Sequence, residues 1–263
     1  MRELNIAVCI KQIPDPEATP SDVRVDQEAK RVSVVGLAPV ISPFDENALE
    51  AALRIKENYG AKITAISVGN KLSSSVLMKA LAVGTDDLIS AEDGSFEDLD
   101  TNSTAYVLST IIKREKYDLI LLGRQAGDWD TGQTGLILAE ILKIPSINLV
   151  RKIDVEDGKL IVEKVRPDGY ELIKVPIPAL LAVSNEVGEL RYASVKALQA
   201  ARKKHIKSLN AANLGVDPQK LKKVEIVELY KPFSERKGVF IEGESEEEKG
   251  ERLAIRLKED KMI

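Results

Sequence analysis

The segment from Asp118 to Gly135 constrains the fold of this chain more strongly than any other. It joins a short apolar run, a turn rich in glycine and aspartate, and the start of a helix. Glycines let a backbone approach a ligand closely, and free N–H groups at a helix start suit a phosphate. Arg124 adds a permanent positive charge, and its planar guanidinium carries several N–H donors that can bind two oxygens at once. We therefore expect a nucleotide-binding turn at the end of a strand in an open α/β sheet.

Apolar runs alternate with helical patterns along the first 150 residues. This alternation is typical of a parallel sheet covered by helices on both faces. The predicted fold class is therefore α/β, with a doubly wound and mostly parallel sheet. Strands are expected at 5–10, 62–69, 118–122 and 146–150, and helices at 42–59, 73–83, 102–114 and 131–143.

The pattern changes after residue 150. Two β-type runs flank Pro167-Asp168-Gly169, which is a strong hairpin signal, and a hairpin insertion is expected over 153–176. An apolar run at 179–183 returns to the buried sheet, and a basic helix is expected from Val195 to about Ile206. Residues 1–209 are therefore predicted to form a nucleotide-binding α/β domain that contains this hairpin.

The alternation of apolar runs and helical patterns ends at about Asn210. Val224–Tyr230 is a candidate strand, and residues 244–258 are acidic and weakly helical. This segment has too few apolar residues to build a core of its own. We expect 210–263 to be a C-terminal extension that packs on a partner subunit.

Composition excludes several classes of function. The net charge of −4 gives no basic field, so nucleic acid is not an expected partner. With one cysteine, Cys9, and one histidine, His205, we expect no metal site within the chain. No serine lies in a nucleophile-elbow pattern, and we expect no catalytic side chain. No apolar run is long enough to cross a bilayer, so we expect a cytoplasmic protein without direct membrane insertion.

Several short motifs, each weak alone, occur in an order and spacing that together are specific. They are Val8–Asp15, Ser42–Asp45 with the helix that follows, Ala80–Asp86, Gly123–Gln125, Arg191–Ser194 and Leu214–Asp217. In these motifs the sequence resembles, over nearly its whole length, the β subunit of electron transfer flavoprotein, the family that includes FixA-type proteins. The resemblance implies a fold like that of the adenine nucleotide α-hydrolases.

In that family the β subunit forms a heterodimer with an α subunit that carries an FAD for electron transfer. The resemblance implies that electrons pass from a dehydrogenase or NADH, through FAD, to an acceptor, while the protein positions the cofactors. The β subunit binds AMP in simple carriers and a second FAD in electron-bifurcating members. An NADH-oxidising flavin site is expected only in the bifurcating case.

The nucleotide site implied by the resemblance combines strand ends with the starts of the helices that follow. It comprises Cys9, Ser42, Pro43, Phe44, Asp45, Val68, Gly123, Arg124, Gln125, Ala126, Gly127, Asp128, Trp129, Asp130, Thr131, Gly132, Gln133 and Thr134. The ends of parallel strands meet at one edge of a sheet, which agrees with this assignment. The alternative for Ser42 and Pro43 is that they only cap a helix. Cys9 is expected to contribute mainly backbone.

The sequence leaves the choice between FAD and AMP open and favours FAD. Arg124 and the aspartates that follow it resemble the bifurcating pattern. Trp129, however, replaces a Gly that is common in those members, and Leu136 replaces a Pro. The indole of Trp129 could stack on a flavin or fill its space. The alternative is a β subunit that holds a structural AMP.

The segment from Arg191 to Ala200 resembles the loop and helix with which family members grip acyl-CoA and other dehydrogenases. Arg191, Tyr192, Val195 and Lys196 are the predicted partner-binding residues, with Val195 as the apolar anchor. The alternative places Val195 in the core. A function of another class, a stand-alone adenine-nucleotide sensor, has no use for the hairpin and the long tail, which count against it.

Overall fold

The structure, a computed structural model, describes residues 3–221, 224–231 and 238–263, and the chain divides into two compact units. The first unit, Met1–Glu228, contains a large sheet, and the second, Leu229–Ile263, contains a helix. The boundary expected after residue 209 falls inside the first unit. The reason is that the side chains of Ala211, Leu214 and Leu221 are buried in a core of that unit.

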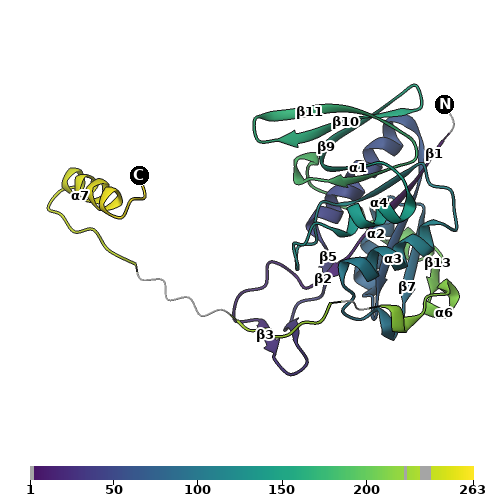
Figure 1. Cartoon of the computed structure of the whole chain (residues 1–263), viewed down its shortest axis with the longest axis horizontal. Coiled ribbons are helices and arrows are strands. Elements are labelled where there is room, and N and C mark those ends of the chain that lie inside the picture. The colour runs from purple at the N-terminus through teal and green to yellow at the C-terminus, as the bar shows by residue number, and fades with distance from the viewer. Residues whose placement is uncertain (1–2, 222–223, 232–237) are drawn as a thin grey trace. The chain divides into compact units, whose positions relative to one another are not determined.

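Nine strands of the described residues form one sheet (Figure 1). Their order is β11-β10-β9-β12-β8-β1-β6-β7-β13. Their bounds are β1 Leu4–Cys9, β6 Ala61–Gly69, β7 Asp87–Glu92, β8 Leu119–Gly123, β9 Ser146–Glu156, β10 Lys159–Arg166, β11 Gly169–Pro176, β12 Ala179–Val183 and β13 Ile206–Leu209. Neighbouring strands from β9 to β13 are parallel, and β9, β10 and β11 pair antiparallel. The predicted α/β class with a mostly parallel sheet is confirmed.

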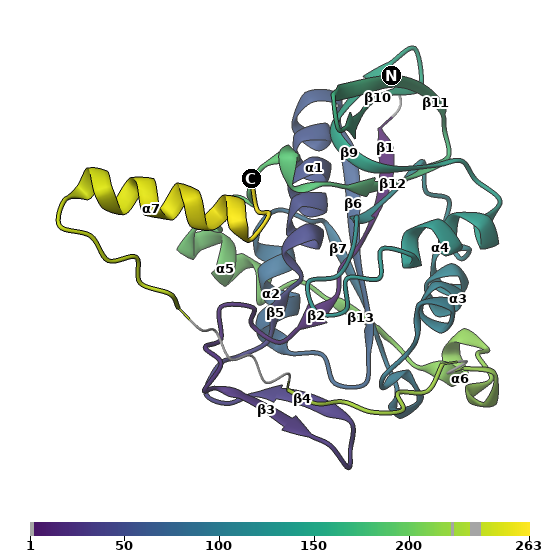
Figure 2. The same cartoon turned by 60° about the vertical axis from the view of Figure 1, so that its left-hand side comes forward.

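Helices cover both faces of the sheet, as Figure 2 shows. α1 (Pro43–Tyr59), α2 (Ser74–Ala82) and α5 (Val195–Ala201) lie on one face, and α3 (Thr101–Ile112) and α4 (Thr134–Leu142) lie on the other. Successive strand side chains point to opposite faces. Ile6 and Val8 therefore pack in the core under α1, and Ala7 and Cys9 pack in the core under α3 and α4. None of the described helices is long and apolar enough to cross a membrane.

The first unit also contains shorter elements. β2 (Gln12–Ile13) pairs with β5 (Val40–Ile41), and β3 (Val23–Asp26) pairs with β4 (Arg31–Val34), both antiparallel. α6 (Ala211–Leu214) and three single turns of 3₁₀ helix, at Gly94–Phe96, Asn185–Val187 and Pro218–Lys220, lie in the connections.

Local sequence signals place the helix ends. Asp100 precedes α3, and its carboxylate accepts a hydrogen bond of 2.7 Å from a backbone N–H of the first turn. Gly60 follows α1 with a φ of 76°, which glycine adopts without the strain that a Cβ adds. α4 begins at Thr134 and not near residue 131, because Asp130 and Gly132 have φ values of 50° and 63° that a helix does not allow.

The insertion after residue 150 is larger than expected. The predicted hairpin is β10–β11 with its turn at Pro167-Asp168-Gly169, and it is confirmed. β9 also continues to Glu156 and turns into β10 at Asp157-Gly158, where both residues have positive φ. Asp-Gly is a strong signal for a two-residue hairpin turn, and the sequence prediction overlooked it. β9 is therefore parallel to β12 in its first half and antiparallel to β10 in its second.

Two predictions near the end of the first unit are wrong. The basic helix α5 ends at Ala201, and Ile206 begins β13, where it pairs with Leu88 of β7. Val224–Tyr230, which the structure describes, forms no strand. Val224 and Val227 are 65% and 87% exposed, so this run has no apolar face packed against a core.

The second unit contains α7 (Glu246–Glu259), where the sequence predicted a weak helix. Ser245 caps it by accepting a hydrogen bond of 3.2 Å from the N–H of Glu248. Acidic residues occupy the first turn, and Arg256 and Lys258 lie in the last turn, which suits the helix dipole. The packing of this extension on a partner subunit stays a prediction.

Candidate functional site

The order of the strands creates a switch point between β1 and β8. The chain runs from β1 to β6 and β7 on one side, and then returns to place β8 and β12 on the other side of β1. The helices that follow neighbouring strands therefore diverge at the carboxyl ends of β1 and β8. In open α/β sheets, ligands bind in the crevice at such a point. The predicted loop after Gly123 begins there.

Asp45, in the first turn of α1, spans this switch point. One carboxylate oxygen accepts a hydrogen bond of 2.8 Å from the N–H of Lys11, just after β1, and the other accepts one of 2.8 Å from the N–H of Gly123, at the end of β8. Burial raises the pKa of Asp45 to about 7, although these two N–H groups and the ammonium of Lys11 act to lower it. The side chain thus joins three elements in a place with little water.

Gly123 allows α1 to approach β8 closely. A Cβ at this position would lie 2.6 Å from the backbone carbon of Phe44 and 2.8 Å from the N of Asp45. Backbone atoms cannot move aside as a flexible side chain can, so any residue other than glycine would separate the strand from the helix. The first glycine of the predicted loop therefore serves the packing of α1 on β8.

Ser42 contacts the loop and does more than begin a helix. Its carbonyl accepts the first hydrogen bonds of α1, but its side chain makes no capping bond. The Oγ instead accepts a hydrogen bond of 3.2 Å from the N–H of Gly127. A Cβ on Gly127 would lie 3.1 Å from Ile13 and 3.2 Å from Pro43, so the loop lies close against α1 here.

Arg124 supplies a donor that has no partner in the structure. Its guanidinium lies over the ring of Phe44, 4.8 Å from the centroid, which holds the side chain in place. Its Nε is buried, and it is one of the few buried side-chain nitrogen or oxygen atoms of the described residues that make no hydrogen bond. A buried N–H without a partner is costly, so this atom favours an acceptor on a ligand.

The rest of the loop is organised by polar contacts and remains open to solvent. Lys11 Nζ lies 2.7 Å from both carboxylate oxygens of Asp128, and Gln125 donates a hydrogen bond of 2.8 Å to Asp130. Trp129 is 57% exposed. The predicted residues Ala126, Thr131, Gly132, Gln133 and Thr134 complete the segment up to the start of α4.

Two predicted residues lie at neighbouring strand ends. Cys9 is the last residue of β1 and is buried, and burial followed by the charge of Asp45 raises the pKa of its thiol far above the ordinary value. Val68 lies near the end of β6, the strand beside β1.

Lys11, which contacts both Asp45 and Asp128, was not among the predicted site residues. Its position directly after the first strand was the signal that could have identified it.

The predicted partner-binding residues lie on and beside a loop tied to α1. Arg191 donates to the buried carboxylate of Glu50 through its backbone N–H and two side-chain nitrogens, at 3.0–3.2 Å, and it also pairs with Glu57. Tyr192 and Val195 are 98% and 73% exposed. Arg191 is therefore engaged within the chain, while its neighbours are open to a partner.

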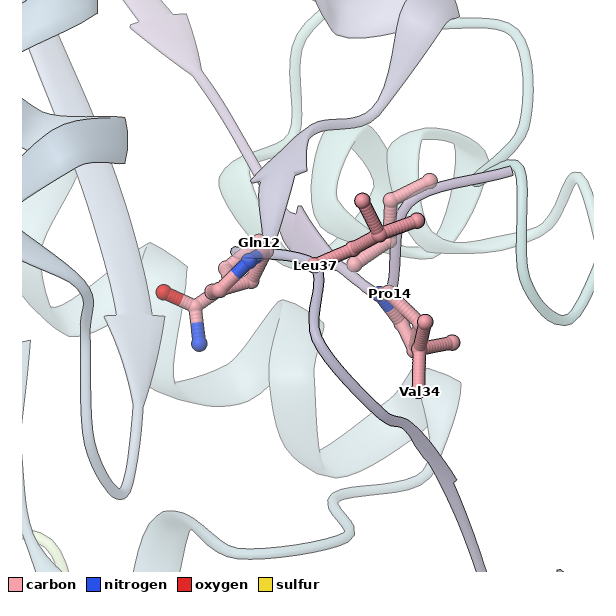
Figure 3. A pocket seen from close by; sticks show the side chains of 6 residues that line it. Gln12, Pro14, Val34 and Leu37 are labelled. Carbon is pink, nitrogen blue, oxygen red and sulfur yellow. The ribbon is translucent and has the colours of Figure 1, made fainter. Parts of the chain in front are cut away.

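A groove and a smaller cavity lie near these regions. The groove has a volume of about 460 Å³, and Pro43 and Asn47 of α1 line it together with the loop from Gly188 to Ala193. Figure 3 shows the cavity, about 200 Å³, with Gln12, Pro14, Val34 and Leu37 among its lining residues. The cavity is small for a dinucleotide and contains no predicted site residue.

Comparison with known proteins decides the family. A family model described as the electron transfer flavoprotein domain matches residues 34–214. The electron transfer flavoprotein subunit beta of Thermoanaerobacterium thermosaccharolyticum is 41% identical over 249 residues, which cover 93% of this chain and 94% of the relative. The chain belongs to the electron transfer flavoprotein β-subunit family. The resemblance drawn from the motifs is confirmed.

Two other relatives show the breadth of this family. The caffeyl-CoA reductase-Etf complex subunit CarD of Acetobacterium woodii is 35% identical over 266 residues, which cover 99% of this chain and all of the relative. Protein FixA of Azotobacter vinelandii is 31% identical over 221 residues, covering 81% of this chain and 77% of the relative. As a β subunit of an electron transfer flavoprotein, the chain acts in electron transfer together with a partner subunit.

Proposed function

We propose that this chain forms a heterodimer with an electron transfer flavoprotein α subunit and holds an adenine nucleotide at the β1–β8 switch point. The heterodimer carries electrons between a dehydrogenase or NADH and an acceptor by means of FAD. In the β-subunit site we favour FAD, which makes electron bifurcation possible, and AMP is the alternative. The single observation that carries this proposal is the buried, unpartnered Nε of Arg124 at the switch point.

The residues present fit the phosphate-bearing part of such a nucleotide. Arg124 offers an N–H that lacks an acceptor and a fixed positive charge. The Ser42 hydroxyl, which accepts from the Gly127 N–H, can still donate its own hydrogen, and the loop that follows offers backbone and amide groups. The acidic side chains of the loop suit ribose hydroxyls better than phosphates. A bound flavin would supply the redox chemistry, and this chain would bind and orient it.

Trp129 bears on the choice between FAD and AMP. Its indole is 57% exposed, so it is available to a large ligand and does not fill the site from within the core. This observation supports FAD, because an exposed indole can stack on a flavin ring. AMP requires no such contact, and a complex with AMP in this site would act as a simple carrier.

Partner binding is proposed for Tyr192, Val195 and Lys196, with Arg191 holding the loop. An exposed valine beside an exposed tyrosine makes a small apolar contact surface, and the lysine adds a charge at its rim. We propose an acyl-CoA or other dehydrogenase as the protein that docks there. The extension after residue 228 is proposed to pack on the α subunit.

The cofactor content of the purified heterodimer tests the proposal. The complex is expressed with its α subunit, denatured, and the released nucleotides are separated and counted by absorbance. Two FAD per heterodimer support the favoured version, and one FAD with one AMP supports the alternative. A heterodimer that releases no purine beyond the α-subunit FAD, or a chain that remains monomeric beside the α subunit, would contradict the proposal.

A further inference from the structure

Asp45 lies at the nucleotide site, yet its carboxylate is not free to contact a nucleotide. Both oxygens accept backbone N–H groups at 2.8 Å, one from Lys11 after β1 and one from Gly123 at the end of β8. One donor lies just after β1 and the other is the last residue of β8, and the switch point opens between these two strands. The side chain is only 6% exposed, so water does not replace either bond.

We propose that Asp45 is a positioning residue that holds the ends of β1 and β8 at the separation that the nucleotide needs. This inference rests on the proposed function and adds a regulation of the same site. We call the two hydrogen bonds from the Lys11 and Gly123 N–H groups to Asp45 the clamp. The groups proposed to surround the nucleotide adjoin these two amides: the side chain of Lys11 pairs with Asp128, and Gly123 is followed by Arg124. A shift of either strand end would displace these groups.

Two donors require two acceptors, and only the ionised carboxylate provides them. A protonated carboxyl group keeps one carbonyl oxygen, and its O–H is itself a donor that opposes the second N–H. The groups that face Asp45 are Cys9 and Lys11 from the end of β1 and Asp128 from the loop after β8. Lys11 favours the ionised form, whereas Asp128 and burial oppose it.

The clamp therefore depends on pH in a defined direction. Burial places the pKa of Asp45 at about 7, so both forms are populated near neutral pH. Nucleotide binding is strongest above this pKa, where both bonds form, and it weakens as the pH falls through it. By linkage, the bound nucleotide lowers the pKa of Asp45, because it prefers the clamped form.

The test compares Asp45→Asn with Glu46→Gln in the heterodimer with its α subunit. Glu46 is the next residue of the same helix turn and pairs with Lys79, so its variant loses the same charge without touching the clamp. An Asn side chain has only one acceptor oxygen, which can accept one of the two backbone N–H groups. Its NH2 group then faces the other backbone N–H, so two donors oppose each other. We expect Asp45→Asn to bind FAD or AMP, whichever the wild type retains, about 10-fold more weakly at pH 8.

The pH profile provides a readout that a purely structural role would not change. Between pH 8.5 and 5.5 the affinity of the wild type and of Glu46→Gln should fall together, with a midpoint near 7, and that of Asp45→Asn should stay low. Because Asp45→Asn is measured with the same probe and lacks the titrating carboxyl, its profile records any titration of the nucleotide itself, which is then subtracted. Should Asp45→Asn fail to fold, the wild-type profile alone decides, and a flat profile overturns the inference.

The outcomes separate this inference from the proposed function. If the wild type binds the nucleotide but Asp45→Asn matches Glu46→Gln in affinity and in pH profile, the clamp is overturned and the function stands. If the wild-type heterodimer binds no adenine nucleotide in the β subunit, the proposed function is wrong, and the role proposed for Asp45 is wrong as well.

Discussion

Asp45 and Gly123, which are 78 residues apart in the sequence, are joined by a hydrogen bond of 2.8 Å from the Gly123 N–H to the carboxylate. This bond attaches the start of α1 to the end of β8, the strand that lies beside β1 in the sheet. The geometry of the candidate site thus depends on a contact between two elements rather than on one loop.

Gly123→Ala should destabilise the protein. The added Cβ would lie 2.6 Å from the backbone of Phe44, which can move only if α1 moves. We expect the free energy of unfolding to fall by about 1–3 kcal/mol, measured by urea denaturation. Gly94→Ala is the matched control, because nothing lies within 4 Å of its added Cβ. Equal effects of the two substitutions would contradict the close approach.

Arg124→Ala should weaken nucleotide binding by about 1.5–3 kcal/mol, the contribution of a charge-assisted hydrogen bond. Isothermal titration with FAD and with AMP measures the effect. Arg151→Ala is the control, because Arg151 lies over Tyr170 at 4.9 Å, much as Arg124 lies over Phe44 at 4.8 Å. Nucleotide retention that is unchanged in Arg124→Ala would exclude a direct role for this arginine.

Glu50→Gln should loosen the loop that carries the predicted partner-binding residues. Burial raises the pKa of Glu50, but the hydrogen bonds from Arg191 and Arg54 outweigh it and place the pKa below the ordinary 4.5. The ionised group therefore stabilises the fold above pH 4.5, and this contribution is lost as the pH falls through the lowered pKa. We expect Glu50→Gln to lower the free energy of unfolding by about 1–3 kcal/mol at pH 7.

Glu57→Gln is the control for Glu50. Glu57 also pairs with Arg191, but its side chain is 56% exposed and the pair is screened by solvent, so we expect a much smaller change in the free energy of unfolding than for Glu50→Gln. Urea denaturation at pH 7 and pH 4 measures both variants. If Glu50→Gln loses no stability at pH 7, the loop is not held by this carboxylate.

Trp129 offers an optical report on the site, since it is the one tryptophan of the chain. Its indole is 57% exposed, and a flavin that stacks on it should quench its emission strongly. AMP should change the emission much less. The wild-type heterodimer and the Trp129→Phe heterodimer are each titrated with FAD and with AMP while the emission is recorded. The difference between them separates the emission of Trp129 from that of the α subunit. Equal responses to FAD and AMP would remove the support that Trp129 gives to FAD.

The sequence predicted the elements better than their contacts. The alternation of strands and helices predicted the parallel sheet, and the predicted loop follows β8 at the switch point, where nucleotide binding stays a prediction. The bond from Lys11 to Asp45 spans 34 residues and depends on the strand order, which local patterns do not contain. Arg191 was expected to face a partner, yet Glu50 on α1 engages it, because the pairing of two distant charges follows from the fold.

The start of α4 shows a different limit. Glycine and aspartate at residues 127–132 indicated a turn, but the sequence did not say how many residues the turn would use. Asp130 and Gly132 adopt positive φ, which delays the helix to Thr134. Backbone conformations of this kind are set by contacts such as the one between Gln125 and Asp130, which form only after the loop has been placed.

Cys9, the one cysteine of the chain, has a practical consequence for experiments. Because its thiol is buried and its pKa is raised, it should not react with maleimides or nitroxide reagents under native conditions. A second cysteine introduced at the exposed position of Leu172 on β11, away from the proposed docking residues, would then be the one reactive thiol of this chain for a spin label or dye. Motion and docking of the assembled flavoprotein could be followed from that one position without first removing the native sulfur.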